Sequence, residues 1–396
     1  MTPTTSPELQ AFVAAHYRND LSKLAFRREL LPGYDRRFVM NQLYGKQKAA
    51  TKLPTWFAEP AVLYPDKLAM EQCSSERTAR FKADLIGGER LLDMTGGFGV
   101  DSFFFSKNFD RVDYVEQRVE LTELAAANFS VLGATNITAH PTDALAFLKK
   151  IGPQYDWIFI DPARRDSRGG RVFRLADCIP NVLEIRDLLV EKSRGLLLKV
   201  SPMVDIRAAL ADLLRVSRVY VVAVANEVKE LLLYADGNVT EPVQYYCVNL
   251  LPGGVDEVYQ SVANRTVEVT YGPPESYLYE PNASILKAGL FNEIAADFGL
   301  KKLHPNSHLY TSADRCVDFP GRQFVLTGEC AVQRKALRKL LPELKANLTV
   351  RNFPMSVAQL RKKLNLRDGG HHYLFATTLP DEQTRLLLTR KVESLD

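Results

Sequence analysis

The chain has 396 residues, of which 46% are hydrophobic and 25% charged, and its formal net charge is +4 at pH 7. This length predicts two to four folded units, and the composition is typical of a globular protein. There is no run of about 18 apolar residues and no signal-peptide pattern at the N-terminus, so neither a transmembrane helix nor secretion is expected. Five scattered cysteines without a C-x-x-C pair favour reduced thiols in the cytoplasm and argue against a structural zinc site.

Positive charge is concentrated at the two ends of the chain. Residues 1–75 carry 10 Lys and Arg against 7 Asp and Glu, residues 322–396 carry 14 against 7, and the middle carries 27 against 33. This asymmetry suggests a polyanionic partner that the ends of the chain bind. Ordinary solvated helix faces would explain the charge alone nearly as well.

Residues 1–75 predict an N-terminal helical domain. Apolar side chains recur at helical spacing from Leu9 to Tyr17 and from Leu21 to Leu30, and a further helix is indicated over Phe38–Tyr44. The chain leaves the helix before Pro54, because proline biases the preceding residue towards extended geometry. No catalytic grouping occurs here, and we expect a helical cap.

A strand, a glycine-rich turn and a helix follow. An apolar run ends at Leu92, and after it come Asp93 and the glycines Gly96, Gly97 and Gly99. Glycine permits the sharp turn and the close approach of a ligand to the backbone. The spacing is not that of G-x-G-x-x-G and no Gly-Lys-Ser/Thr follows, so neither the dinucleotide fingerprint nor a P-loop fits. The alternative interpretation is a tight turn that binds nothing.

From here the chain alternates between strands and helices, as a doubly wound sheet requires. The expected strands are 111–116, 136–139, 156–161, 195–200, 219–225 and 242–250, and the expected helices are 121–132, 144–150 and 178–190. This pattern predicts an α/β catalytic domain over residues 76–250. Residues 251–322 predict a linker and a small α+β module with a helix over 282–299, and 323–396 predict a second α+β module.

Acidic residues end four of the segments. They are Asp93, Glu116, Asp143 and Asp161. Ligands bind beyond the carboxyl ends of parallel strands, and Glu116 lies near the roughly 20-residue offset at which an acid meets a ribose diol. One such acid is usually a polar loop residue, but four in register indicate a nucleotide cofactor.

The stretch Asp93–Asp101 resembles motif I of class I S-adenosylmethionine-dependent methyltransferases. The resemblance implies a Rossmann-like sheet and S-adenosylmethionine as cofactor, with Glu116 at the ribose and Asp143 at the adenine amino group. The cofactor-binding residues that it implies are Asp93, Thr95, Gly96, Gly97, Gly99, Asp101, Glu116 and Asp143.

Asp161-Pro162-Ala163-Arg164 stands where class I enzymes that methylate exocyclic amines carry Asp/Asn/Ser-Pro-Pro-aromatic. In that motif the side chain and a backbone carbonyl accept hydrogen bonds from the target amine. The resemblance implies Asp161, Pro162 and Arg164 as catalytic residues. The Arg164 guanidinium could stack on a base or bind a phosphate, at the start of a basic loop over residues 164–171. A salt-bridged surface loop is the alternative.

Residues 74–200 resemble the RNA guanine amino-methyltransferases, which include trimethylguanosine synthase, although Ala163 and Arg164 replace the aromatic platform and argue against cap methylation. The C-terminal stretch resembles a THUMP-like RNA-binding module, and the whole chain resembles a bacterial methyltransferase family with such a domain. The polar stretch Glu71–Ala79 reads as a helix cap, or as an element that passes near the cofactor. No cysteine follows Lys199–Pro202, so covalent uracil C5 chemistry is not expected.

The sequence thus predicts a methyltransferase that acts on a base amine of structured RNA, either tRNA or rRNA. A small-molecule or protein methyltransferase is one alternative, and a non-catalytic RNA-binding protein on the same fold is another. No metal or membrane partner is expected. The spacing of His304 and His308 is interrupted by Pro305, and His371 and His372 follow a turn, so these histidines are interpreted as structural or exposed.

Overall fold

The computed structural model describes residues 5–24, 30–152, 155–164, 175–213, 215–237, 242–262 and 265–392. The chain forms two compact units, Met1–Val219 with Glu230–Glu241, and Tyr220–Lys229 with Pro242–Asp396. Among the described helices, none combines the length and the apolar character needed to cross a membrane. All five cysteines are free thiols.

The N-terminal part of the first unit is helical, as expected. Its helices are α1 (Pro7–His16), α2 (Leu21–Leu24), α3 (Arg36–Lys52), α4 (Pro54–Ala58) and α5 (Lys67–Gln72). Helix α3 is longer than predicted and ends just before Leu53-Pro54; residues 25–29 lie outside the described part. Buried Asn128 ties this segment to the rest of the unit, because its side-chain amide exchanges hydrogen bonds of 2.9 and 2.8 Å with the backbone of Leu63.

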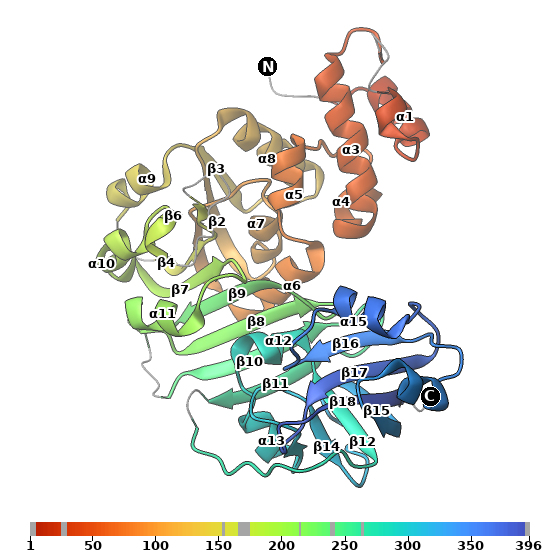
Figure 1. Ribbon diagram of the computed structural model, residues 1–396. Helices are drawn as coiled ribbons and strands as arrows, with labels where there is room; N and C mark the ends of the chain where they lie inside the picture. The colour runs from red at the N-terminus through yellow and green to blue at the C-terminus, as the bar shows by residue number, and fades with distance from the viewer. Residues whose placement is uncertain are drawn as a thin grey trace. The chain divides into compact units, whose positions relative to one another are not determined.

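A mainly parallel sheet forms the centre of the first unit (Figure 1). Its described strands are β1 (Gly88–Asp93), β2 (Phe109–Glu116), β3 (Ile137–Pro141), β4 (Tyr155–Ile160), β7 (Ser193–Val200) and β9 (Glu227–Ala235). They lie in the order β9-β7-β4-β1-β2-β3, and all neighbours are parallel except β9, which is antiparallel to β7. The chain leaves β1 towards β2 on one side and enters β4 on the other, so the loops after β1 and β4 flank the switch point where ligands bind in such sheets.

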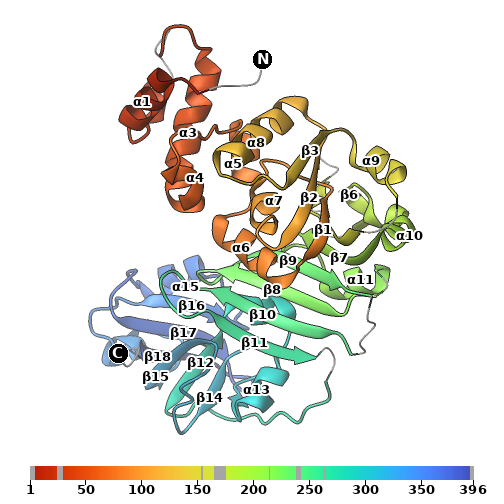
Figure 2. The same cartoon turned by 180° about the vertical axis from the view of Figure 1, so that it is seen from behind.

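Helices cover both faces of this sheet, as Figures 1 and 2 show from opposite sides. On one face lie α6 (Glu76–Leu85), α7 (Val100–Phe105) and α8 (Val119–Val131), and on the other lie α9 (Ala144–Lys150), α10 (Val182–Lys192) and α11 (Ile206–Asp212). The predicted helix over 178–190 begins later than expected, because Cys178–Ile179 form the short strand β6, which pairs with β5 (Ala163–Arg164). Asn181 then caps α10 by accepting from the Leu183 N–H.

The prediction missed strand β9 altogether. Its sequence, EVKELLLYA, reads as neither a clean alternation nor a purely apolar strand, because Glu230 lies within the buried run. Only the position beside β7 shows why an acid is tolerated there: Glu230 is 2% exposed and pairs with a buried lysine described below.

The second unit holds two groups of strands. The first group is β8 (Arg218–Val224), β10 (Gln244–Leu250) and β11 (Glu257–Val262), in which β10 lies beside β8 and pairs antiparallel with β11. We expected residues 242–250 to be the last strand of the catalytic domain; β11 follows it, within a stretch whose sequence predicts a connection.

The second group is a seven-stranded sheet in the order β13-β14-β12-β15-β18-β17-β16. Its strands are β12 (Tyr277–Pro281), β13 (Lys301–Lys302), β14 (Tyr310–Ser312), β15 (Gly321–Cys330), β16 (Asn347–Arg351), β17 (His372–Thr378) and β18 (Thr384–Lys391). The predicted helix over 282–299 is instead two helices, α12 (Ala283–Ala288) and α13 (Glu293–Asp297). Gly289 adopts a left-handed φ of 76° and ends α12, a conformation that glycine favours at helix ends.

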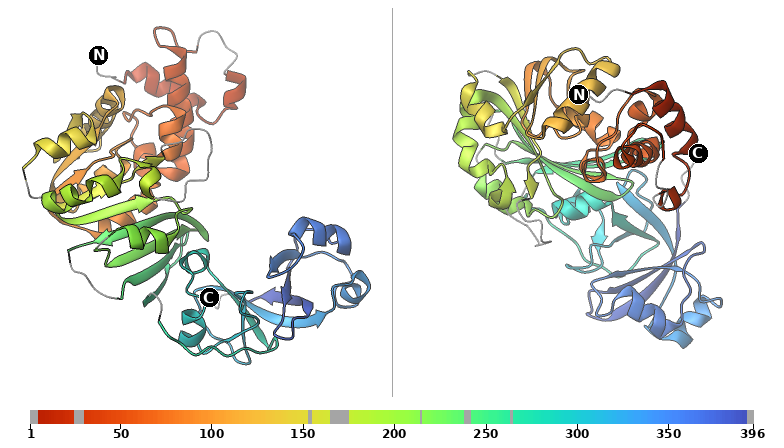
Figure 3. Two further views of the ribbon diagram at one scale, coloured as in Figure 1. Left: turned by 60° about the vertical axis from the view of Figure 1, so that its left-hand side comes forward. Right: turned by 90° about the horizontal axis from the view of Figure 1, so that it is seen from above.

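The basic helices α14 (Arg334–Leu340) and α15 (Val357–Leu364) lie against the β16–β18 end of this sheet (Figure 3). Their apolar faces, including Leu337, Leu360 and Leu364, are buried with Leu374 and Leu386 of the sheet. Burial of this face explains why both helices form, and it leaves their lysines and arginines on the outer side.

Candidate active site

The glycine loop after β1 is held from behind by Asp93. This side chain is 1% exposed, accepts a 3.0 Å hydrogen bond from the Thr95 N–H and a 2.5 Å bond from the Ser102 hydroxyl, and does not itself line the pocket. Burial, together with the charges of Asp101 and Asp161, raises the pKa of Asp93 to about 7, although Ser102 and Thr95 favour its ionised form. Asp93 therefore shapes the loop rather than facing a ligand.

Two of the loop glycines are required by their packing. A Cβ on Gly96 would lie 2.1 Å from the ring of Tyr114, and one on Gly99, whose φ is +84°, would lie 2.6 Å from the ring of Phe129. Gly97 differs, because its φ is +55° but its Cβ position meets nothing nearer than the Thr95 carbonyl at 3.8 Å. It lines the pocket. The loop is thus packed tightly below and open above.

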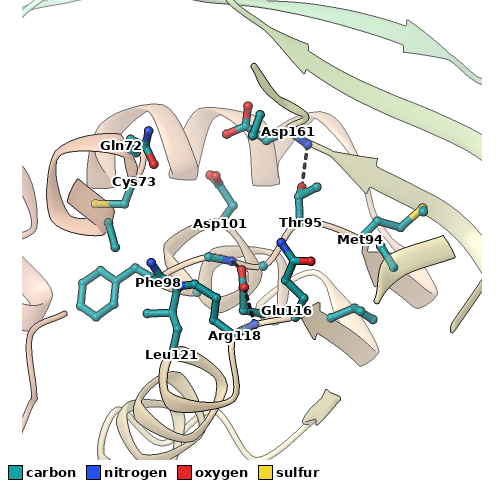
Figure 4. Close-up of a pocket in the computed structure, with 18 of the residues that line it drawn as sticks. Gln72, Cys73, Met94, Thr95, Phe98, Asp101, Glu116, Arg118, Leu121 and Asp161 are labelled. Atoms are coloured by element: carbon teal, nitrogen blue, oxygen red, sulfur yellow. Dashed lines mark hydrogen bonds between the residues drawn. The ribbon is translucent and has the colours of Figure 1, made fainter. Parts of the chain in front are cut away.

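The pocket at this switch point has a volume of about 340 Å³ (Figure 4). Predicted site residues that line it are Thr95, Gly96, Gly97, Gly99, Asp101, Glu116, Asp143 and Asp161, and further lining residues include Gln72, Cys73, Ser74 and Leu121. The structure thus brings together segments from the ends of β1, β2, β3 and β4. The polar stretch before α6 reaches the pocket as well, while Ser75 caps α6 by accepting from the Thr78 N–H.

Glu116 and Asp143 lie on the β2–β3 side of the pocket. The Glu116 carboxylate accepts hydrogen bonds from the N–H groups of Gly97, at 3.2 Å, and Arg118, at 2.8 Å, one to each oxygen (Figure 4). Each oxygen keeps a further lone pair with which it could accept from a ligand hydroxyl. Asp143 caps helix α9 through the Ala146 N–H at 2.8 Å and is exposed to the pocket.

Asp161 follows β4 on the opposite side. Its backbone N–H donates a 2.7 Å hydrogen bond to the Thr95 hydroxyl, which links this residue to the glycine loop (Figure 4). Its side chain is 34% exposed and forms an ion pair with Lys199 of β7. Pro162 follows but does not line the pocket, whereas Ala163 does. Arg164 is described only as part of β5, and Arg165–Arg171 of the expected basic loop lie outside the described residues.

A buried network of charged side chains lies between the glycine loop and Asp161, and sequence reasoning missed most of it. Lys82 of α6 is 0% exposed; its ammonium group lies 2.9 Å from both Glu230 oxygens, 3.1 Å from the Ser74 hydroxyl and 3.2 Å from Asp101. Lys199 lies 3.4 Å from the same Ser74 hydroxyl. The Ser74 hydroxyl donates to Asp101 at 2.7 Å. Two cations thus face three carboxylates, those of Asp101, Asp161 and Glu230.

The pKa values in this network follow from burial and pairing. Burial alone would raise the pKa of Asp101, but Lys82, Lys199 and Ser74 more than offset this and lower it. Burial raises the pKa of Glu230, which the two lysines only partly counteract. For Lys199, burial favours the neutral amine, yet Asp161, Glu230 and Asp101 outweigh it and raise the pKa of this group above its usual range. Asp101 and Lys199 are therefore charged at neutral pH.

The histidines lie elsewhere. His304 is buried, and its ring nitrogens contact Glu382 at 3.1 Å and Asn352 at 2.9 Å. His308 stacks on Phe291, with ring centroids 3.5 Å apart, and burial lowers the pKa of His308 to about 4. Both histidines are structural, as predicted. The described residues contain no group of three or more potential metal ligands.

The pocket fits S-adenosylmethionine on three counts. Its volume falls within the range of roughly 300–1,000 Å³ that is usual for small-molecule sites. Gly97 leaves room for a ligand directly over the backbone. The carboxylates of Asp101 and Glu116 suit a ligand that carries a positive charge and a ribose diol.

Comparisons with known proteins agree with this geometry. Family models match a ferredoxin-like domain over residues 277–320 and a THUMP domain-like region over residues 321–391. Two proteins of Mycobacterium tuberculosis, strains CDC 1551 / Oshkosh and ATCC 25618 / H37Rv, are 25% identical over 313 residues, which span 77% of this chain and 81% of theirs. Both are described as uncharacterized S-adenosylmethionine-dependent methyltransferases.

A solved structure matches almost the whole chain. It is that of a candidate methyltransferase from Porphyromonas gingivalis W83, 32% identical in sequence, with a TM-score of 0.86 over 97% of this chain and 98% of that one. The match confirms the predicted fold, and the named relatives confirm the predicted cofactor. The chain belongs to this family of class I S-adenosylmethionine-dependent methyltransferases, which carry a THUMP-like domain in their C-terminal part.

Proposed function

We propose that the protein methylates an exocyclic amine of a base in structured RNA, either tRNA or rRNA. The observation that carries this proposal is the position of Asp161. It follows β4, lines the cofactor pocket and is joined to the glycine loop through Thr95. An acceptor at this place can receive a hydrogen bond from an amine while the amine nitrogen faces the methyl group.

In the proposed mechanism Asp161 orients the nucleophile. When bound, S-adenosylmethionine supplies a methyl group on a positively charged sulfur, which departs as a neutral thioether. Asp161 accepts one amine hydrogen and the Pro162 region accepts the other, which directs the nitrogen lone pair towards the methyl group. The nitrogen becomes acidic once the new N–C bond has formed, and its proton then passes to solvent. No side chain with a neutral pKa is required.

Support for an RNA substrate comes from the C-terminal part. The THUMP-like match covers residues 321–391, and α14 and α15 expose basic side chains on their outer faces. Phosphate contacts by lysine and arginine contribute affinity without reading sequence. Such contacts suit an enzyme that recognises a folded RNA and modifies one base within it.

The experiment that tests this function is mass spectrometry of RNA nucleosides from cells with and without the gene. We expect one N-methylated base to disappear with the gene and to be restored by the wild-type protein. A loss of methyl from carbon or ribose oxygen would contradict the substrate class. Unchanged RNA nucleosides would favour a small-molecule or protein substrate, or a non-catalytic role.

The role of Asp161 is tested separately with purified protein. Asp161→Ala should lower kcat by about 100-fold or more, since it removes positioning at the reacting atom, while S-adenosylmethionine still binds. Asp187→Ala on helix α10, where the side chain is 97% exposed, is the matched control and should keep full activity. Near-normal methylation by Asp161→Ala would contradict the mechanism.

A further inference from the structure

We propose that Lys199 is a positioning residue that acts through Asp161: its ammonium group binds one carboxylate oxygen of Asp161 and thereby aims the other oxygen at the target amine. This inference rests on the proposed function of Asp161. It assigns a role to a lysine that belongs to no glycine-loop or Asp-Pro motif and that lies 38 residues further along the chain.

The contacts of Asp161 leave one oxygen available. Its backbone N–H is bound to the Thr95 hydroxyl at 2.7 Å, and its Oδ2 is bound to the Lys199 ammonium group. Within the described part of the chain, no hydrogen bond reaches Oδ1. The side chain is therefore held at two points, and the free oxygen belongs to a residue that lines the pocket. An acceptor held in this way needs no further ordering when the substrate arrives.

Lys199 itself is well fixed. It lies on β7, which is parallel to β4 and pairs with it, so its backbone is set by the sheet. The side chain is 13% exposed, and Ser74 lies 3.4 Å from its ammonium group. Since the surrounding carboxylates raise its pKa, the amine stays protonated and cannot serve as the base.

The need for a cation follows from the crowding of acids. Groups facing this region are Asp93 after β1, Asp101 on α7, Asp161 after β4, Glu230 on β9, and the cations Lys82 on α6 and Lys199 on β7. Without Lys199, Asp161 would be repelled by Asp101 and Glu230 and would turn towards the solvent. A like-charge cluster of this kind does not keep a carboxylate in one orientation without a counter-ion.

The two lysines divide the network between them. Lys82 contacts Asp101 and Glu230, and thus the cofactor side of the pocket. Lys199 contacts Asp161, on the substrate side, and shares only Ser74 with Lys82. Loss of Lys199 should therefore affect turnover more than cofactor affinity.

The pairing also explains how an acid can occupy this position without removing a proton. A carboxylate whose charge is partly neutralised by an ammonium group is a weaker base, yet it remains a hydrogen-bond acceptor. In the Asp/Asn/Ser motif that the stretch resembles, a neutral amide can stand at the same place. Lys199 thus lets Asp161 act as an acceptor alone.

The test uses the full-length protein with total RNA from cells that lack the gene and S-adenosylmethionine labelled in its methyl group. Lys199→Met should lower kcat by about 10- to 100-fold, with little change in the KM for either substrate. Lys199→Arg should recover part of this loss, because it keeps the cation. Asp161→Asn combined with Lys199→Met should be much less impaired than the product of the two single effects, since the residues act as one unit.

The matched control is Arg194→Met. Arg194 pairs with Asp156 at 3.2 Å across the same two strands, β7 and β4, but at the end away from the pocket, and it is 81% exposed. This variant should keep wild-type kcat. If Lys199→Met were too unstable to purify, Lys199→Arg and the double variant would still measure the coupling.

The outcomes separate this inference from the proposed function. If Asp161→Ala loses activity but Lys199→Met does not, or if the Lys199 and Asp161 effects simply multiply, Lys199 does not act through Asp161. A rise in the KM for RNA at constant kcat would make Lys199 a substrate contact and overturn the positioning role. A wild-type protein that methylates no RNA would overturn both proposals.

Discussion

Replacing Gly97 by alanine tests the cofactor pocket with a single methyl group. The Gly97 backbone cannot retreat, because its N–H is bound to Glu116 at 3.2 Å and its carbonyl accepts a 2.5 Å hydrogen bond from the Tyr114 hydroxyl. Tyr114 is fully buried and is itself held in place by packing. The added Cβ would contact no protein atom closer than 3.8 Å, so it would occupy pocket space rather than strain the fold by collision.

Two costs of this substitution can be separated. The left-handed backbone, with φ at +55°, should cost alanine about 1–2 kcal/mol of folding stability. The methyl group over the loop should separately weaken S-adenosylmethionine binding by at least about tenfold, which corresponds to about 1.4 kcal/mol.

Gly133→Ala is the matched control, since Gly133 has a φ of +74° and its Cβ position is also open. It ends helix α8, outside the pocket lining. Both variants should lose similar stability in urea unfolding, but only Gly97→Ala should lose affinity for S-adenosylmethionine in calorimetry. Equal cofactor affinity in the two variants would refute the assignment of this loop.

Three further predictions concern the buried charges and the basic helices. Lys82→Met should reduce the free energy of unfolding by about 3–5 kcal/mol, because it strands the Glu230 and Asp101 carboxylates; the exposed Lys229→Met should change it by no more than about 0.5 kcal/mol, and similar values for both would contradict this reasoning. Because burial raises the pKa of Asp93 to about 7, the wild-type protein should lose stability relative to Asp93→Asn as pH rises from about 4 to 7, where the buried carboxyl must ionise; urea midpoints at pH 5 and 8 that differ equally between the two proteins would argue otherwise. Replacing four exposed lysines of α14 and α15 by glutamine should lower the salt slope of RNA binding by about 0.7 for each phosphate that the variant no longer binds, and an unchanged slope would place the RNA elsewhere; the lysines are Lys335, Lys339, Lys362 and Lys363.

Much of the first unit was predictable because its signals are local. An apolar strand followed by Asp93 and three closely spaced glycines can only turn sharply, and the structure places the glycines under the pocket. The helix over residues 121–132 with Gly133 at its end was also predicted, and α8 ends at Val131 with Gly133 at φ +74°. Periodicity and turn residues act over a few positions, so they can be interpreted without the tertiary structure.

The second unit was predicted less well where elements are short. The helix expected over 282–299 broke at Gly289, although the apolar spacing continued beyond it. Strand β11 was hidden in a segment rich in turn residues. The division of the chain into domains 1–75, 76–250, 251–322 and 323–396 stays a prediction, and β15 pairs with both β12 and β18, which joins residues of the last two segments in one sheet.

The sequence by itself determined the fold class, the cofactor loop and the acids that end successive strands, because each rests on residue types at short, regular spacing. Only the tertiary structure decided which charges pair. Lys82 meets Glu230 across 148 residues, and Lys199 meets Asp161 across 38. Neither lysine stands out in the sequence, since a lysine in a strand or helix is usually solvated. It is the shared burial beneath the glycine loop that turns them from surface residues into part of the active site.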